Sequence, residues 1–199
     1  MKIEFHPVSE IFPLMNGEAF SQLVADVKAN GLREAIWRHE NKIIDGRNRY
    51  RACGEAGVEP RFQEWDGNGS LVAFVVSLNL HRRHLDESQR AMVAAKIANL
   101  DEGNPHLELT TPIGAVKISQ SEAAEMLNVG RRSVSRAKSL QDHGIPELIE
   151  SVEQGRVTLF AAQAVSREDP QEQKRIIAEA EVVSIINRFR RQLKEHLHV

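Results

Sequence analysis

The first hundred residues carry two different hydrophobic periods. Residues 3–6 alternate apolar and polar side chains, as a half-buried strand does. Between residues 18 and 30, apolar side chains recur at i, i+3, i+4 and i+7, which places them on one helix face: Phe20, Leu23, Val24 and Val27. Extended to the whole segment, these patterns predict strands at residues 3–6, 35–38, 42–44 and 62–65, and helices at residues 18–30, 47–57, 71–78 and 87–100. Such a mixture predicts an α/β or α+β unit.

The second half of the chain has a different character. Residues 101–117 contain two glycines and two prolines without a clear period, which predicts a linker. From Ser119 onward the pattern is helical, with breaks at Gly130, Gly144 and Gly155 and a new helix start at Asp169-Pro170. The sequence therefore predicts an α+β protein with three parts: an α/β domain at 1–100, a linker at 101–118 and an all-helical domain at 119–199.

Composition limits the class of protein. Of the 199 residues, 41% are hydrophobic and 27% are charged, which suits a soluble protein that buries a core. The single cysteine, Cys53, excludes an intramolecular disulfide and fits a reducing cytoplasm. No apolar run reaches the roughly 20 residues of a membrane span, and the N-terminus lacks the apolar region of a signal peptide. The net charge of −2 counts mildly against nucleic-acid binding, although local clusters of charge matter more than the total.

One local cluster follows the predicted strand at residues 42–44. Gly46 separates this strand from a helical segment that carries Arg47, Arg49 and Arg51. A glycine lets the backbone approach a ligand closely, and the first N–H groups of a helix attract anions. This segment is therefore either a phosphate cradle or an ordinary helix start with solvated arginines. Asp45, beside the glycine, either belongs to the turn or orients an arginine, and its residue type favours the turn.

The segment from 119 to 138 has the pattern of a helix-turn-helix. Ala123, Ala124 and Leu127 share a helical spacing, and Val134 faces back toward them across a short turn. The second helix is basic and contains no acidic residue between 131 and 138. Because the start of such a helix meets base edges and phosphates, the pattern favours DNA binding over an ordinary helical hairpin. The predicted DNA contacts are Gln120, Arg131, Arg132, Ser133, Ser135, Arg136 and Lys138.

Taken in order, these motifs resemble the ParB-like proteins over residues 1–168. The resemblance rests on the strand, Gly-Arg-Asn-Arg-Tyr-Arg-Ala at 46–52, Asn-Leu-His-Arg-Arg-His-Leu at 79–85, the long helix and the helix-turn-helix. It implies a ParB/sulfiredoxin-like nucleotide-binding domain followed by a DNA-binding domain. It also implies sequence-specific binding of double-stranded DNA by a cytoplasmic homodimer, CTP with Mg²⁺ as a switch, and a role in partition or transcriptional regulation. A partition ATPase is then a further possible partner.

The family motifs are matched only in part. The family pattern Gly-Glu-Arg-Arg-x-Arg-Ala falls on residues 46–52, and Glu-Asn-x-x-Arg falls on residues 78–82. By resemblance, the nucleotide-binding residues are Gly46, Arg47, Arg49, Arg51, Asn79 and Arg82. Asn79 is also the only metal ligand that the second motif retains, because Leu78 replaces its glutamate and a leucine cannot bind Mg²⁺. The departures indicate a divergent member from a plasmid, a phage or another mobile element.

Two other functions stay open at this stage. Some ParB-like proteins are described as nucleases or NTPases, which would make this chain an enzyme, although Leu78 argues against a metal site. A nucleotide-independent transcriptional repressor is the other alternative. A thiol reductase is not favoured, since Arg47 occupies the place of the sulfiredoxin cysteine and Cys53 falls within the predicted helix as a packed residue. A zinc site at His81 and His84 is not favoured either, because no further cluster of ligands accompanies them.

Overall fold

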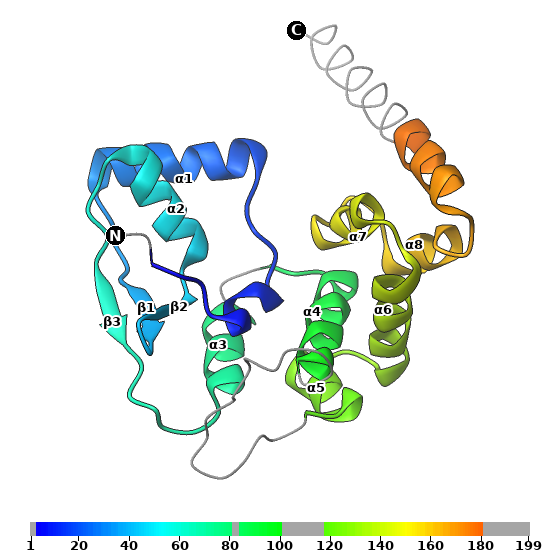
Figure 1. Ribbon diagram of the computed structural model, residues 1–199, viewed down its shortest axis with the longest axis horizontal. Helices are drawn as coiled ribbons and strands as arrows, with labels where there is room; N and C mark the ends of the chain where they lie inside the picture. The colour runs from blue at the N-terminus through cyan, green and yellow to red at the C-terminus, as the bar shows by residue number, and fades with distance from the viewer. Residues whose placement is uncertain (1–2, 81–83, 101–117, 181–199) are drawn as a thin grey trace, which may run out of the picture.

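The structure, a computed structural model, describes residues 3–80, 84–100 and 118–180. A small three-stranded sheet and two helices occupy one side of the molecule, and a group of helices occupies the other (Figure 1). The fold is therefore mixed α/β, with most of its helices in the second half of the chain. No helix in the described residues is long and apolar enough to cross a membrane.

The sheet has the strand order β2-β1-β3. Strand β1 (Ile36–His39) pairs antiparallel with β2 (Lys42–Asp45) and parallel with β3 (Phe62–Glu64). Glu40 and Asn41, the two residues between β1 and β2, have φ values of 48° and 61°. Both are therefore left-handed, as a tight hairpin turn requires. The strands predicted at 35–38, 42–44 and 62–65 are confirmed within one residue at each end.

The strand predicted at residues 3–6 does not form. Its backbone makes a single bridge, from Phe5 to Ile43, with two hydrogen bonds of 2.9 Å to that residue of β2. Pro7 then begins the 3-10 helix η1 (Pro7–Ile11), and the buried His6 caps this helix by accepting from the Val8 N–H. Because a proline cannot donate to a sheet ladder, the pairing ends there.

Two helices complete the first side of the molecule. Helix α1 (Gly17–Asn30) packs on α2 (Arg47–Ala56), and their apolar faces meet the sheet in a buried cluster. The cluster contains Phe20, Val27, Leu32, Ile36, Ile43, Ala52 and Cys53. Cys53 is 1% exposed, which confirms it as a small packed residue.

The remaining helices share a second, larger core. It runs from η1 and α3 (Leu71–Leu80) through α4 (Glu87–Asn99) to four further helices. These are α5 (Gln120–Met126), α6 (Arg131–His143), α7 (Pro146–Glu153) and α8 (Leu159–Val165). Helix α4 packs against all four of them and carries a capping box between Asp86 and Gln89 at its start. The division into domains at 1–100, 101–118 and 119–199 stays a prediction; residues 101–117 and 181–199 lie outside the described residues.

Residues 170–180 are also helical, as predicted. Asp169 accepts from the N–H groups of Gln171 and Glu172 and so caps this helix. Gln173 is 1% exposed and uses its amide for several bonds: it accepts from the Ile145 N–H and donates to the carbonyls of His143 and Glu168. The buried amide thereby ties the start of this helix to the junction between α6 and α7.

Candidate functional site

The junction of β2 and α2 is built around Gly46. Its φ of 99° lies in the left-handed region, where a residue with a Cβ is strained. A Cβ at this position would also come within 3.1 Å of the Arg49 guanidinium and 3.3 Å of the Ile36 side chain. Conformation and close packing therefore both require glycine here, and the start of α2 lies against the Arg49 side chain.

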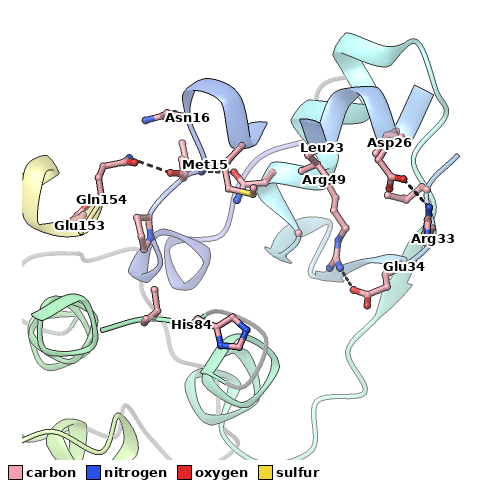
Figure 2. A pocket seen from close by; sticks show the side chains of 18 of the residues that line it. Met15, Asn16, Leu23, Asp26, Arg33, Glu34, Arg49, His84, Glu153 and Gln154 are labelled. Carbon is pink, nitrogen blue, oxygen red and sulfur yellow. Dashed lines mark hydrogen bonds and ion pairs between the residues drawn. The ribbon is translucent and has the colours of Figure 1, made fainter. Parts of the chain in front are cut away.

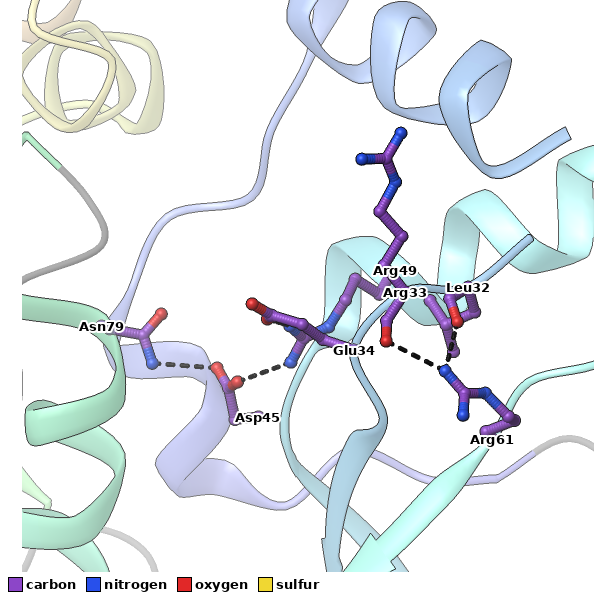
Figure 3. A network of polar contacts seen from close by, with 7 residues as sticks. All are labelled: Leu32, Arg33, Glu34, Asp45, Arg49, Arg61 and Asn79. Carbon is purple, nitrogen blue, oxygen red and sulfur yellow. Dashed lines mark hydrogen bonds and ion pairs between the residues drawn. The ribbon is translucent and has the colours of Figure 1, made fainter. Parts of the chain in front are cut away.

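A buried polar network fixes Arg49 (Figure 3). The Asp45 carboxylate accepts from Asn79 Nδ2 through Oδ1 and from Arg49 Nη2 through Oδ2, each at 2.9 Å. Arg49 Nη1 donates to the Glu34 carboxylate on its other side. Asp45 is 5% exposed and Asn79 is 1% exposed. The structure thus shows Asp45 orienting an arginine. The sequence had favoured the other alternative, a turn residue.

The other two arginines of α2 point elsewhere. Arg47 Nη2 donates to the Phe12 carbonyl at 2.6 Å, and Arg51 Nη1 donates to the Met15 carbonyl at 3.2 Å. The Arg51 guanidinium also lies 4.1 Å from the centroid of the Phe20 ring. Burial lowers the pKa of Arg47 below its usual value, because desolvation disfavours the charged form. These two side chains hold residues 12–15 against α2.

A cleft of about 750 Å³ opens beside the start of α2 (Figure 2). Gly46, Asn48 and Arg49 line it, whereas Arg47, Arg51 and Asn79 do not. Arg82 lies outside the described residues. The cleft walls come from both sides of the molecule: Pro13, Leu14, Met15, Asn16, Ala19, Leu23, Asp26, Val27, Gly31, Leu32, Arg33, Glu34, His84, Leu85, Gln89, Glu153 and Gln154. The sequence pattern identified few of these residues, because they come from segments far apart along the chain.

The charges around the cleft are mixed. Arg33 pairs with Asp26 at 2.8 Å, and Glu153 pairs with Lys96 at 2.6 Å. The Arg49 guanidinium and the start of α2 are the features that favour an anion, since helix N-termini and guanidinium groups both attract negative charge. Glu34 would compete with such an anion for Arg49. The cleft volume and the apolar side chains of Leu14, Met15 and Leu23 leave room for a ligand that also has an apolar part.

The Mg²⁺ site that the resemblance implies stays a prediction. Among the described residues, no group of three or more His, Cys, Asp or Glu side chains is placed to hold a metal ion. The Asn79 amide is buried and donates to Asp45 and to the Val75 carbonyl. Its neighbour, Leu78, offers no oxygen ligand.

The outer face of α6 forms a second candidate site. Arg131, Arg132, Ser135 and Arg136 are exposed, and Gln120, Ser133 and Lys138 are half-buried. On the opposite face, Val134, Ala137 and Leu140 are fully buried. Residues 127–130 connect α5 to α6, and Val134 packs in the same core as Ala123, Ala124 and Leu127. Six of the seven predicted DNA contacts thus lie on α6 and Gln120 lies at the start of α5, and the three arginines among them are exposed to solvent.

Two residues that contact α6, Glu87 and Phe160, were not predicted from the sequence. Ser133 Oγ donates to the Glu87 carboxylate of α4 at 3.3 Å. The guanidinium of Arg136 lies 5.8 Å from the centroid of the Phe160 ring of α8. Both neighbours lie far from α6 in sequence, so local spacing gave no signal for them.

The chain is similar to solved structures but not to any family model or curated protein. Solved structures similar to it include two of the C-terminally truncated chromosome-partitioning protein ParB from Caulobacter crescentus, each 17% identical. The complex with CTP-gamma-S aligns over 84% of this chain and 95% of that one, with a TM-score of 0.29. The complex with the centromeric parS site aligns over 87% and 95%, with a TM-score of 0.38.

Proposed function

We propose that the protein binds double-stranded DNA through the outer face of α6. The observation that carries the proposal is the separation of the two faces of this helix. Val134, Ala137 and Leu140 fix it in the core, while Arg131, Arg132 and Arg136 extend into solvent. Arginines in this position pair with phosphates and with guanine in the major groove. The slightly acidic total charge does not oppose this, because phosphate binding depends on the local positive face.

The direct test is fluorescence anisotropy with duplexes selected from random DNA. We expect the Arg132→Ala variant to bind its selected site about 1–3 kcal/mol more weakly than the wild type if the residue contacts a base. Arg131→Ala should reduce the salt dependence of binding if it contacts a phosphate. Lys28→Ala is the matched control, because it removes one exposed positive charge from α1, away from α6. Equal affinities of the Arg132 variant and the control variant would contradict the proposal.

The proposal extends to an anionic ligand, with CTP as the first candidate, in the cleft beside α2. Arg49, oriented by Asp45, and the N-terminus of α2 would hold its phosphates, and the apolar wall would face the rest of it. Double-stranded DNA, a second copy of the chain and, in a partition role, an ATPase are the proposed partners. Partition of a mobile element and transcriptional regulation are the two roles that suit a DNA-binding protein with such a ligand.

Calorimetric titration with CTP tests the cleft. We expect heat of binding with the wild type and tighter binding with Glu34→Gln, because that variant removes the carboxylate that competes for Arg49. Glu55→Gln, which makes the same charge change on an exposed part of α2 outside the cleft, should bind CTP as the wild type does. If none of the three proteins gives heat with CTP while DNA binding is intact, the nucleotide proposal is contradicted. The remaining candidate function is then a nucleotide-independent repressor.

A further inference from the structure

Phe160 is an unusual surface residue. It is 71% exposed and is the sole large hydrophobic side chain with such exposure in the parts of the chain that the structure describes. Helix α8 packs inward through Leu159 and Ala162, which are 5% and 0% exposed. Phe160 therefore contributes little to the core, and the fold does not explain an aromatic residue at this position.

The Phe160 ring belongs to the same surface as the basic face of α6. Its centroid is 5.8 Å from the Arg136 guanidinium, close enough for a cation–π interaction. The start of α8 is fixed there by the Leu159 N–H, which donates to Ser88 Oγ of α4 at 3.0 Å. The neighbouring Glu87 accepts from Ser133 of α6. Three helix segments thus converge, and the ring lies at the edge of the face that carries the predicted DNA contacts.

From this position we infer that Phe160 is a DNA-contacting residue whose ring packs against thymine methyl groups in the major groove. This inference rests on the proposed DNA binding by α6. The thymine methyl is the apolar group that base pairs present in the major groove, and phenylalanine is one of the side chains suited to contact it. A protein partner is less suited to this surface, since docking patches are contiguous apolar areas and their centres are depleted of charge. Phe160 is isolated among the exposed side chains of the described residues and has the charged Arg136 beside it.

The test uses a duplex that the wild-type protein selects from random DNA and a second duplex in which uracil replaces every thymine. Uracil pairs as thymine does but lacks the methyl group. We expect Phe160→Ala to bind the thymine duplex about fivefold or more weakly than the wild type, a loss of the size of one mismatched base pair. The wild type should lose affinity similarly on the uracil duplex, whereas the variant should bind both duplexes alike. Phe160→Leu, which keeps an apolar side chain, should restore part of the difference.

The outcomes separate this inference from the proposed function. If the wild-type protein binds no duplex DNA, both fail together. If it binds DNA but selects no sequence, the inference alone fails, because a thymine contact requires a sequence preference. If it selects a site but Phe160→Ala binds that site as well as the wild type, the inference alone fails. Equal losses by the variant on both duplexes would also overturn it, because the ring would then act without the methyl groups. Thermal unfolding of the variants provides the folding control, and the exposure of Phe160 predicts little change.

Discussion

The arginines of α2 and those of α6 look alike in the sequence but are used differently in the fold. In α2, Arg47 and Arg51 donate to main-chain carbonyls and Arg49 is held by carboxylates. In α6, Arg131 and Arg132 are exposed to solvent. Arg47 and Arg51, with their main-chain acceptors, mainly stabilise the fold, whereas a solvated arginine is available to a phosphate. The comparison shows that a cluster of arginines after a glycine does not by itself define an anion site.

The largest expected effect concerns the acceptor at the centre of the α2 network. Replacing Asp45 with alanine leaves the Arg49 guanidinium, whose side chain is 13% exposed, without its buried carboxylate and removes an acceptor of Asn79. We expect the free energy of unfolding to fall by about 3 kcal/mol, as is typical when one partner of a buried pair is removed. Urea denaturation monitored by circular dichroism measures this change.

The matched control is Asp26→Ala. Asp26 also pairs with an arginine, Arg33, but their side chains are 44% and 66% exposed. Exposed pairs contribute about 0–1 kcal/mol, so this variant should remain close to the wild type. If the two variants lose similar free energies of unfolding, burial does not make the Asp45–Arg49 pair stronger than the Asp26–Arg33 pair. The comparison between α2 and α6 would then be weakened.

A smaller effect is expected at Arg47. The Arg47→Ala variant leaves the Phe12 carbonyl without this donor and removes a side chain that lies over the Phe5 ring. Because burial already disfavours the charge of Arg47 and lowers its pKa, part of the cost is offset. We expect a loss of about 1–2 kcal/mol in the free energy of unfolding, near the lower range for hydrogen bonds to charged groups. The Arg132→Ala variant should lose less than about 0.5 kcal/mol in the same measurement, because Arg132 is an exposed surface residue. A larger loss for Arg132→Ala than for Arg47→Ala would contradict the distinction between the structural arginines of α2 and the solvated arginines of α6.

Local patterns predicted the elements of the fold well. The strands β1 and β2, helix α4 and the helix start at Asp169 depend on neighbouring residues, so their signals lie within short windows of sequence. The strand predicted at residues 3–6 was wrong because its alternation is too short to pair beyond one bridge before Pro7 begins η1. A local pattern cannot report how much of a partner strand is available.

The candidate sites were predicted only in part. Val134 was predicted to face the preceding helix, and it is fully buried, whereas Arg131 and Arg132 are exposed. No pattern in the sequence indicated that Arg47 and Arg51 donate to main-chain carbonyls 35 and 36 residues away. Which acceptor a long cationic side chain finds depends on packing between elements that are distant in the sequence. The contacts of Phe160 and Glu87 with α6 could not be predicted from the sequence for the same reason.

The smallest expected effect tests whether the face of α6 responds to charge alone. Glu87 is an exposed acid that accepts a hydrogen bond from Ser133, near the positive end of α6. It should repel phosphates that approach this face. We expect Glu87→Gln to tighten binding to a random duplex by about 0.3–1 kcal/mol at low salt, the range for a charge at a helix terminus. The gain should diminish as salt screens the charge.

Two controls make this last measurement decisive. Glu55→Gln removes the same charge from α2 and should leave DNA affinity unchanged, because α2 lies on the other side of the molecule (Figure 1). Thermal unfolding should show that α4 keeps its start in the Glu87 variant, since the capping box uses Asp86 and Gln89 rather than Glu87. If the two variants bind the random duplex equally, local charge at α6 does not govern DNA binding. If Glu87→Gln binds more weakly, Glu87 does not repel phosphates at this face, because the glutamine removes the charge and keeps an acceptor oxygen for Ser133.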